Sequence, residues 1–417
     1  MGLIPQKPPP LPPLQEGSFS SRLRTQRGAT LIGIALAVSV GLCFLTGLYS
    51  HLQQHPVEWL PIPALPTWLY RFSQGLHVAS GLAAIPLLLV KLWTVYPRLF
   101  QWPPVAGVVN AVERLLIFVL VAGMIFQLAT GTLNTTQWYP WQFPFVPTHY
   151  AFAFIILGAL LLHVGFKYWT IRRALRTDLA HSAPITNRPE PEEDFGHGAD
   201  DDTDDTESRT PPESAPSPVG GLSRRGLLIT GGVAVGAVTV TTIGQTVSPL
   251  QDIAALAPRI PDIGPQQVPV NRTAQAAGID LLSVEREYAL QLLGPDGEVS
   301  LSLTELGELP QQDVQLPISC VEGWSASALW GGVRIKDLAA LVGGGEGSTV
   351  RVASIEQNWP YARSELQPQF VGSDLTLLAL RINGEVLDAD HGYPARIIAP
   401  NRPGVLQTKW VQRLEVV

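Results

Sequence analysis

The stretch LPISCVEGWSASALWGGVRIKDLAALV, residues 316–342, decides how the second half of the chain folds. An apolar run ends at Cys320, a Gly-Trp pair follows, and a second β-rich run leads into a helical pattern. This pattern predicts a strand that ends at Cys320, a turn and a second strand. Upstream, residues 288–306 (YALQLLGPDGEVSLSLTEL) predict a strand, a Pro-Asp-Gly turn, a strand and a helix start. Residues 265–417 are therefore expected to form one mixed α/β domain.

Cysteine usage makes Cys320 a candidate metal ligand. The chain has two cysteines, and Cys43 lies inside an apolar run, so neither a disulfide framework nor a thiolate zinc site is expected. A soft metal such as molybdenum favours a thiolate in its first shell, and Cys320 is the only cysteine outside the predicted membrane spans. The alternative interpretation is a free buried cysteine.

Two motifs in this region resemble the molybdopterin-binding domain of the sulfite oxidase family. They are CVEGWS with a later Trp-Gly pair, residues 320–331, and LDADHGYPARIIAPNRPGVLQTKWV, residues 387–411. The resemblance spans residues 265–417 and implies the fold of that domain, a molybdopterin cofactor and a molybdenum bond to Cys320. It places five residues near the pterin and its phosphate: His391, Arg396, Gln407, Thr408 and Lys409. Asn271 and Arg272 are expected to contribute to the same pocket.

The phosphate of the pterin is anionic, so cations are expected beside it on physical grounds as well. Surface charge is the alternative interpretation for Arg396 and Lys409.

The residues after Cys320 differ from those of sulfite oxidases. Animal and plant sulfite oxidases carry Asn-Arg-Arg there, which supplies charge for an anionic substrate, whereas this chain has Gly323, Trp324 and Ser325. CVEGWS is similar to the bacterial periplasmic methionine-sulfoxide reductase subunit, whose partner is a separate haem b membrane protein. The sequence ends with KWVQRLEVV, so we expect no C-terminal β-sandwich like that of sulfite oxidases.

These differences favour reduction of a small sulfoxide-like substrate, with Trp324 as a candidate catalytic residue at an apolar entrance. Sulfite-type oxidation is one alternative. A non-catalytic module that binds pterin or a partner protein is another.

Four apolar stretches precede the α/β domain, at residues 29–50, 76–96, 112–133 and 149–171. Each is close to the ~20 residues that span a bilayer core. Basic residues precede the first stretch and follow the fourth, while the third connection, residues 134–148, carries no charge. This distribution predicts a four-helix transmembrane bundle over residues 25–178 with both ends inside, after a disordered, proline-rich segment at residues 1–24.

A weakly apolar run with paired arginines follows an acidic, proline-rich linker at residues 179–222. Arg224 and Arg225 open SRRGLLITGGVAVGAVTVTTIG, which resembles a twin-arginine export signal; an ordinary fifth span is the alternative. Residues 223–248 are expected to anchor the chain, and residues 249–264 to link the anchor to the α/β domain.

The predicted architecture is thus a membrane all-α bundle of four spans plus a fifth anchor span, followed by an extracytoplasmic mixed α/β domain. We expect an integral plasma membrane protein of a bacterium.

Four histidines in or near the apolar stretches are candidate haem ligands, because ionisable residues at that depth are usually functional: His51, His77, His149 and His163. His149 and His163 lie fourteen residues apart on one helix face, about 21 Å along the axis, which suits two stacked haems. His77 begins the second stretch on the same side as His149, so this pair is expected to hold haem b. Lys91, fourteen residues after His77, leaves His163 without a histidine partner.

The spacing resembles that of cytochrome b membrane subunits over residues 25–175. Hydrogen-bonding histidines between helices and a transporter are the alternatives.

The charge distribution limits which classes of binding partner are expected. The formal net charge is −7, and the acidic residues crowd residues 190–213, so neither half is typical of a nucleic-acid binder. The expected partners are a small-molecule substrate and a quinone or an electron-donor protein.

Overall fold

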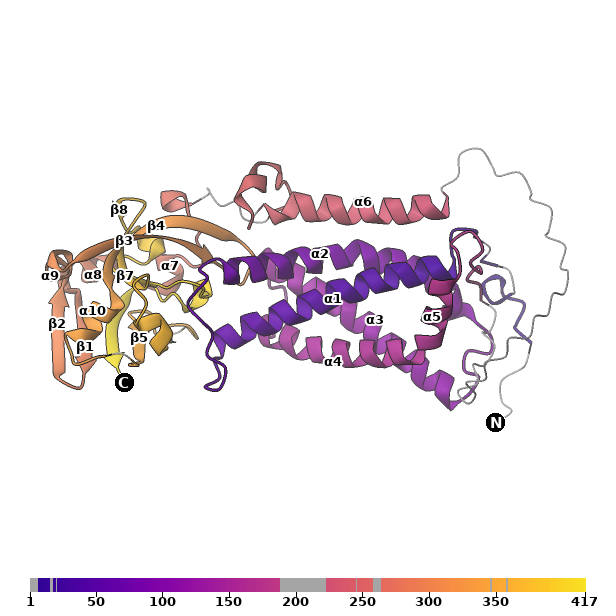
Figure 1. Ribbon diagram of the computed structural model, residues 1–417, viewed down its shortest axis with the longest axis horizontal. Coiled ribbons are helices and arrows are strands. Elements are labelled where there is room, and N and C mark those ends of the chain that lie inside the picture. The colour runs from indigo at the N-terminus through magenta and orange to yellow at the C-terminus, as the bar shows by residue number, and fades with distance from the viewer. Residues whose placement is uncertain are drawn as a thin grey trace. The chain divides into compact units, whose positions relative to one another are not determined.

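Long helices form the first half of the chain in the computed structural model, which describes residues 7–15, 18–19, 21–187, 223–244, 246–257, 264–345, 347–357 and 359–417. They are α1 (Gln26–Gln54), α2 (Leu69–Val95), α3 (Val108–Thr135) and α4 (Phe145–Phe166), with α6 (Arg224–Ile243) later (Figure 1). Among the described residues, these five helices, α2 with its 3₁₀ extension to Phe100, are long and apolar enough to cross a membrane.

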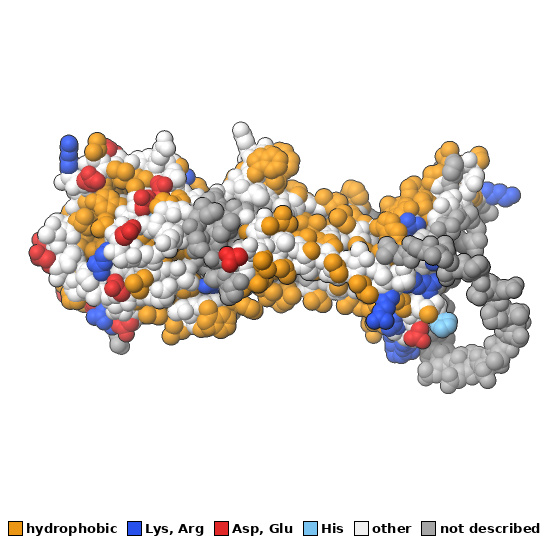
Figure 2. Space-filling view, turned by 90° about the horizontal axis from the view of Figure 1, so that it is seen from above, with side chains coloured by type: hydrophobic (Ala, Val, Ile, Leu, Met, Phe, Trp, Pro, Cys, Tyr) orange, Lys and Arg blue, Asp and Glu red, His pale blue; other side chains and the backbone are white. Residues whose placement is uncertain are grey.

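The helices expose large apolar side chains. Figure 2 shows hydrophobic side chains over the middle of the view, where the long helices lie, and acidic and basic side chains mainly toward both ends of the view. Leu45, Leu89, Phe118 and Leu161 are each more than 60% exposed in this chain alone. Apolar surface on this scale indicates contact with lipid or a partner, because soluble monomers rarely show it.

Helix boundaries differ from the predicted apolar windows. Helix α2 begins at Leu69, so His77 lies in its third turn and the prediction that it opens the helix was wrong. Helix α4 ends at Phe166, five residues earlier than predicted, because Lys167 leaves helical geometry and the basic helix α5 (Tyr168–Arg176) follows. Hydropathy locates the apolar centre of a helix, whereas its ends depend on polar residues that continue the hydrogen-bond ladder.

Contacts group the chain into two compact units. The first comprises Met1–Ala37, Ile85–Gly123 and Ile156–Ala234, and the second comprises Val38–Ala84, Met124–Ile155 and Val235–Val417. The second unit therefore contains one end of each of α1 to α4 together with the whole β-rich domain.

Two five-stranded sheets build the β-rich domain, as labelled in Figure 1. The first has the order β2-β1-β10-β5-β6, in which β1 and β10 are parallel. Its strands are β1 (Ala289–Gly294), β2 (Gly297–Ser302), β5 (Val350–Ser354), β6 (Arg363–Leu366) and β10 (Val411–Val416). The second has the order β3-β4-β7-β8, and β9 pairs with β7. Its strands are β3 (Gln311–Ser319), β4 (Ser325–Arg334), β7 (Leu377–Ile382), β8 (Glu385–Val386) and β9 (Arg396–Ile398).

The local predictions for this domain are confirmed. Strands β1 and β2 form a hairpin, and α9 (Leu303–Glu308) starts directly after β2 with a capping box between Ser302 and Glu305. Strands β3 and β4 pair antiparallel from Gln311↔Val333 to Ser319↔Ser325, so Cys320 stands at the end of a strand.

Two apolar clusters hold the sheets. Leu292 and Val352 from the first sheet pack with Leu338 of α10 (Ile335–Ala340), while Trp330 and Leu316 pack within the second sheet. All five side chains are at most 1% exposed. The segment that follows β3 is thereby attached to a rigid layer.

Parts of the predicted non-helical segments lie outside the described residues. They are residues 1–6, 16–17 and 20 near the N-terminus, 188–222 of the acidic linker and 258–263 of the second linker.

Candidate functional site

The turn after β3 holds Cys320. Its backbone N–H donates to the carbonyl of Trp324 at 2.9 Å, and the N–H of Gly323 donates back to Cys320 at 3.0 Å. Gly323 has φ +98°, a left-handed conformation that favours glycine. Cys320 is 1% exposed, and burial together with the carboxylate of Glu322 raises the pKa of its thiol well above the usual range. The thiol therefore ionises there only if a metal or another cation replaces the lost solvation.

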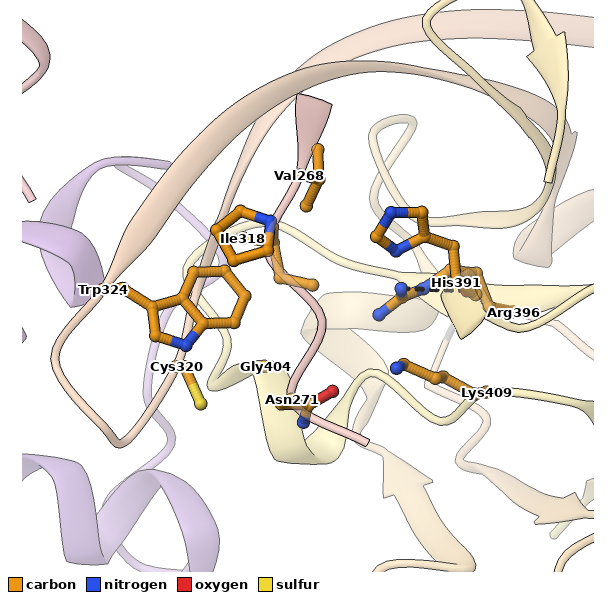
Figure 3. Close-up of a pocket in the computed structure, with 10 residues that line it drawn as sticks. Val268, Asn271, Ile318, Cys320, Trp324, His391, Arg396, Gly404 and Lys409 are labelled. Atoms are coloured by element: carbon orange, nitrogen blue, oxygen red, sulfur yellow. Dashed lines mark hydrogen bonds between the residues drawn. The ribbon is translucent and has the colours of Figure 1, made fainter. Parts of the chain in front are cut away.

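A small pocket opens at this turn, in about 270 Å³ of space that includes open solvent. Its polar lining comes from Asn271, Cys320, Trp324, His391, Arg396 and Lys409. In Figure 3 the nitrogens of Arg396 and Lys409 point into the space opposite Cys320 and Trp324. One side of the pocket thus carries a soft sulfur and an indole, and the other carries two cations.

Both cations are buried without a carboxylate partner. Arg396 lies over the ring of Trp330 and donates only to backbone carbonyls, those of His391 at 3.0 Å and Gln407 at 3.2 Å among the closest. Lys409 donates to the carbonyls of Arg272 and Asp390 at 2.9 and 2.7 Å. Burial lowers the pKa of Arg396 to about 9, and burial and Arg396 lower the pKa of Lys409 to about 7. Within the described residues neither cation forms an ion pair, so the pocket favours an anion.

The HGxPxR segment brings these groups together. Gly392 has φ +106°, and a Cβ there would lie 2.9 Å from the Cβ of Lys409 and 3.2 Å from that of Arg396. His391 lies 2.7 Å from the carbonyl of Pro265 through Nε2, which must therefore carry the proton. Burial, followed by weaker effects that include the nearby cations, lowers the pKa of His391 to about 4, so the imidazole is neutral at pH 7.

Comparison with known proteins assigns this domain. Residues 277–417 match the family described as oxidoreductase molybdopterin binding domain. These residues form a molybdopterin-binding domain of the sulfite oxidase family. The chain therefore carries an oxidoreductase domain.

Relatives cover only part of the chain. Sulfite oxidase of Arabidopsis thaliana is 28% identical, over 28% of this chain and 38% of its own. The uncharacterized oxidoreductase YuiH of Bacillus subtilis is 29% identical, over 31% and 65%. A protein of Azospira oryzae, provisionally named protein-methionine-sulfoxide reductase subunit YedZ1, is 32% identical, over 28% and 43%. This chain thus spans less than two thirds of the length of these relatives.

Among solved structures, the sulfane dehydrogenase SoxCD of Paracoccus pantotrophus matches with a TM-score of 0.29. The match has 23% identity and covers 32% of this chain and 38% of that chain.

The residues of the molybdopterin-binding domain fit its cofactor. The pterin carries a phosphate, and Arg396 and Lys409 offer buried positive charge that nothing else neutralises among the described residues. Cys320 offers a sulfur on the opposite side. The phosphate end of the cofactor therefore matches the side with Arg396 and Lys409, and the metal end matches the side with Cys320.

Three residues expected in this pocket direct their side chains elsewhere. Arg272 pairs with the buried carboxylate of Glu356, with Nε 2.7 Å from Oε1. Gln407 accepts from the N–H of Ala399 and donates to a nearby carbonyl, and Thr408 bonds Ser364. Their contribution to cofactor binding stays a prediction. Gln407 and Arg272 would act through their backbone carbonyls, which accept from Arg396 and Lys409.

Sequence reasoning missed Glu322 and Asn401. Glu322 accepts from Trp324 Nε1 at 3.1 Å and from Gln137, so its buried carboxylate holds the indole at the pocket. Asn401, 2% exposed with φ +51°, accepts from the N–H of Tyr70 at 2.8 Å. Gln137 and Tyr70 lie far from Glu322 and Asn401 in sequence, so no local pattern signals these two contacts.

A histidine pair lies in the same compact unit. The ring centres of His77 on α2 and His149 on α4 are 6.3 Å apart. His77 Nδ1 lies 2.9 Å from the carbonyl of Cys43, and His149 Nδ1 lies 3.0 Å from Thr130 Oγ1. Thr130 Oγ1 also donates to the helix carbonyl of Phe126, so it accepts from His149. Each Nδ1 therefore carries the proton, and each Nε2 keeps a free lone pair, which is the form that binds metal.

The spacing of this pair suits one iron between two imidazoles. A metal–nitrogen bond of about 2 Å plus about 1 Å from nitrogen to ring centre, taken twice, gives about 6 Å. A Cβ added at Gly47 or Gly131 would lie 3.0 or 3.3 Å from the Cε1 of His77 or His149. Glycines thus let both imidazoles lie close against α1 and α3.

The other two candidate histidines are placed differently. His51 stacks on Tyr150 with ring centres 3.7 Å apart and lies beside His55. His163 has a buried Nδ1 without a hydrogen-bond partner among the described residues. The amine of Lys91 donates to the carbonyl of Ala29 at 2.8 Å. A role in haem binding stays a prediction for His51 and His163.

Proposed function

We propose that this chain is a membrane-bound oxidoreductase that couples haem b to oxygen-atom transfer on a small neutral substrate, in the direction of sulfoxide reduction. The observation that carries the proposal is that one compact unit contains both the Cys320 pocket and the His77–His149 pair. Two redox centres in one unit allow electrons to pass inside a single chain.

Each residue of the two candidate sites has its own proposed role. When bound, the molybdenum cofactor supplies two-electron redox chemistry with oxygen-atom transfer. Cys320 would hold the metal, Arg396 and Lys409 would bind the anionic end of the pterin, and Trp324 would form an apolar wall at the substrate side. His77 and His149 would hold the haem. A sulfoxide would take two electrons and two protons and leave as sulfide and water.

The charge beside Cys320 favours a neutral substrate. Glu322 places a buried carboxylate two residues after the cysteine, and the residues that follow carry no cation. A carboxylate repels sulfite, whereas a sulfoxide carries no net charge. The Azospira oryzae relative is provisionally named as a methionine-sulfoxide reductase subunit, which agrees with this choice.

The direction is tested on purified full-length protein loaded with molybdenum. Adding methionine sulfoxide to protein with reduced haem should oxidise the haem, and adding sulfite to protein with oxidised haem should leave it oxidised. Haem reduction by sulfite would reverse the proposed direction. Haem that responds to neither compound would indicate a binding module.

We further propose that α1 to α4 and α6 cross the plasma membrane and that the molybdopterin-binding domain lies outside the cytoplasm. Five apolar helices support this arrangement. Arg224 and Arg225 would direct export by the twin-arginine route, which carries folded domains with their cofactors.

The two arginines allow a sharp test of export, because among the described residues only Arg224 forms hydrogen bonds through its side chain. Arg224 donates to the carbonyls of Arg22, Leu179 and Ala180, while Arg225 is exposed. Arg225→Lys should therefore abolish external display of the domain, measured by protease added to intact spheroplasts. A simple fifth span would tolerate this change, since orientation depends on charge alone. Display of a molybdenum-containing domain in cells without the twin-arginine machinery would disprove the export proposal.

A further inference from the structure

The turn after Cys320 is bound by side chains from two helices. The carbonyl of Val321 accepts from Gln74 Nε2 on α2 at 3.0 Å and from Asn134 Nδ2 on α3 at 3.5 Å. Gln74 is 5% exposed, so its amide is committed to this contact. All three residues belong to the second compact unit. The carbonyl of Val321, next to Cys320, thus accepts hydrogen bonds from side chains of two helices.

Each of these helices leads directly to the histidine pair. The backbone N–H of Asn134 reaches the carbonyl of Thr130 one turn earlier in α3, and Thr130 Oγ1 bonds His149 Nδ1. Gln74 lies three residues before His77 on α2. Short chains of covalent and hydrogen bonds therefore join Val321 to both histidines.

The other contacts of this turn come from residues that lie beyond the helix ends. Gln137 bonds Glu322, and Thr246 donates to the carbonyl of Gly323 at 2.7 Å. Gln137 lies beyond the end of α3 and Thr246 beyond the end of α6, so neither lies on a helical turn with a histidine. Gln137 reaches α3 through its backbone N–H, which donates to the carbonyl of Asn134 at 3.2 Å, so its connection to His149 is longer than that of Asn134.

We propose that the Val321 carbonyl, Gln74 and Asn134 form the electron-transfer route between the haem at His77 and His149 and the metal at Cys320. The inference rests on the proposed function. Each transfer oxidises the haem by one electron and reduces the metal centre by one, and two transfers with two protons convert a sulfoxide to sulfide and water. Electron tunnelling is attenuated less along bonds than across gaps, so losing an amide bridge slows transfer without changing either centre.

Gln74→Met tests this route, because methionine keeps the length and volume of glutamine but has no donor. We expect the rate of electron transfer from flash-reduced haem to the molybdenum centre to fall several-fold in full-length protein, followed at the haem band. The haem spectrum, haem potential and molybdenum content should stay unchanged. Adding Asn134→Leu should lower the rate further.

Gln53→Met is the matched control. Gln53 is also 5% exposed and donates to a carbonyl of the molybdopterin-binding domain, that of Asn401 at 2.9 Å, but among the described residues it forms no hydrogen bond with the turn after Cys320. This variant should lose as much thermal stability as Gln74→Met and keep the wild-type transfer rate. Equal slowing in both variants, or in neither, would overturn the proposed route. If the wild-type protein binds no haem, or shows no electron transfer from the haem to the molybdenum centre, the proposed function itself is refuted.

Discussion

Cys320→Ser is expected to reduce bound molybdenum from one per chain to background and to abolish sulfoxide-dependent oxidation of the haem. A serine oxygen is a harder ligand than sulfur, and a hydroxyl is a far weaker acid than a thiol. This position is fully buried, so no solvent stabilises a charged oxygen. Metal analysis and the reduced-minus-oxidised haem spectrum measure the two effects separately. The haem band should remain at full intensity.

Cys43→Ser is the control for this variant. Cys43 Sγ lies 3.1 Å from Ser80 Oγ and 3.2 Å from the carbonyl of His77, contacts that a hydroxyl also makes. It should keep both molybdenum and haem. Wild-type molybdenum content in Cys320→Ser would remove the assignment of Cys320 as the metal ligand.

His77→Ala and His149→Ala are each expected to remove a b-type haem band while leaving molybdenum in place. Each loses one of the two imidazoles whose ring centres lie 6.3 Å apart, and a haem with one ligand is released or changes its spectrum. Gly131→Val should act in the same direction, because a Cβ at this position already lies 3.3 Å from His149 Cε1.

His181→Ala is the control, since His181 is exposed in the segment after α5. His197, which the sequence also places in the linker, lies outside the described residues. An unchanged spectrum in both His77→Ala and His149→Ala would reassign the pair to helix packing.

Local chemistry predicted the β-rich domain well. The Pro-Asp-Gly turn sets the β1–β2 hairpin, Ser302 with Glu305 starts α9, and the end of an apolar run sets Cys320 at the end of β3. Each of these features depends on residues that are neighbours in sequence. The apolar centres of the long helices were predicted for the same reason.

Side-chain partners were not predictable in this way. Arg272 stands in a motif expected near the pterin, yet its guanidinium pairs with Glu356, which is 84 residues away. Glu322 bonds Gln137, which lies 185 residues earlier, and Gln74 bonds Val321, which lies 247 residues later. Motif position indicates which segment borders a pocket, while the direction of a side chain depends on the tertiary contacts around it.

Asn401 has a bearing on how the protein is assembled. Its side chain accepts from the N–H of Tyr70 and donates to the carbonyl of Pro63, and its own carbonyl accepts from Gln53, all more than 330 residues earlier in the chain. In the proposed membrane arrangement, these bonds form only after export has brought the molybdopterin-binding domain to the side of the membrane on which these three residues lie. Maturation would then end in a docking step, and a domain that is folded and loaded but not yet docked would be its last precursor, tethered by residues that follow α6.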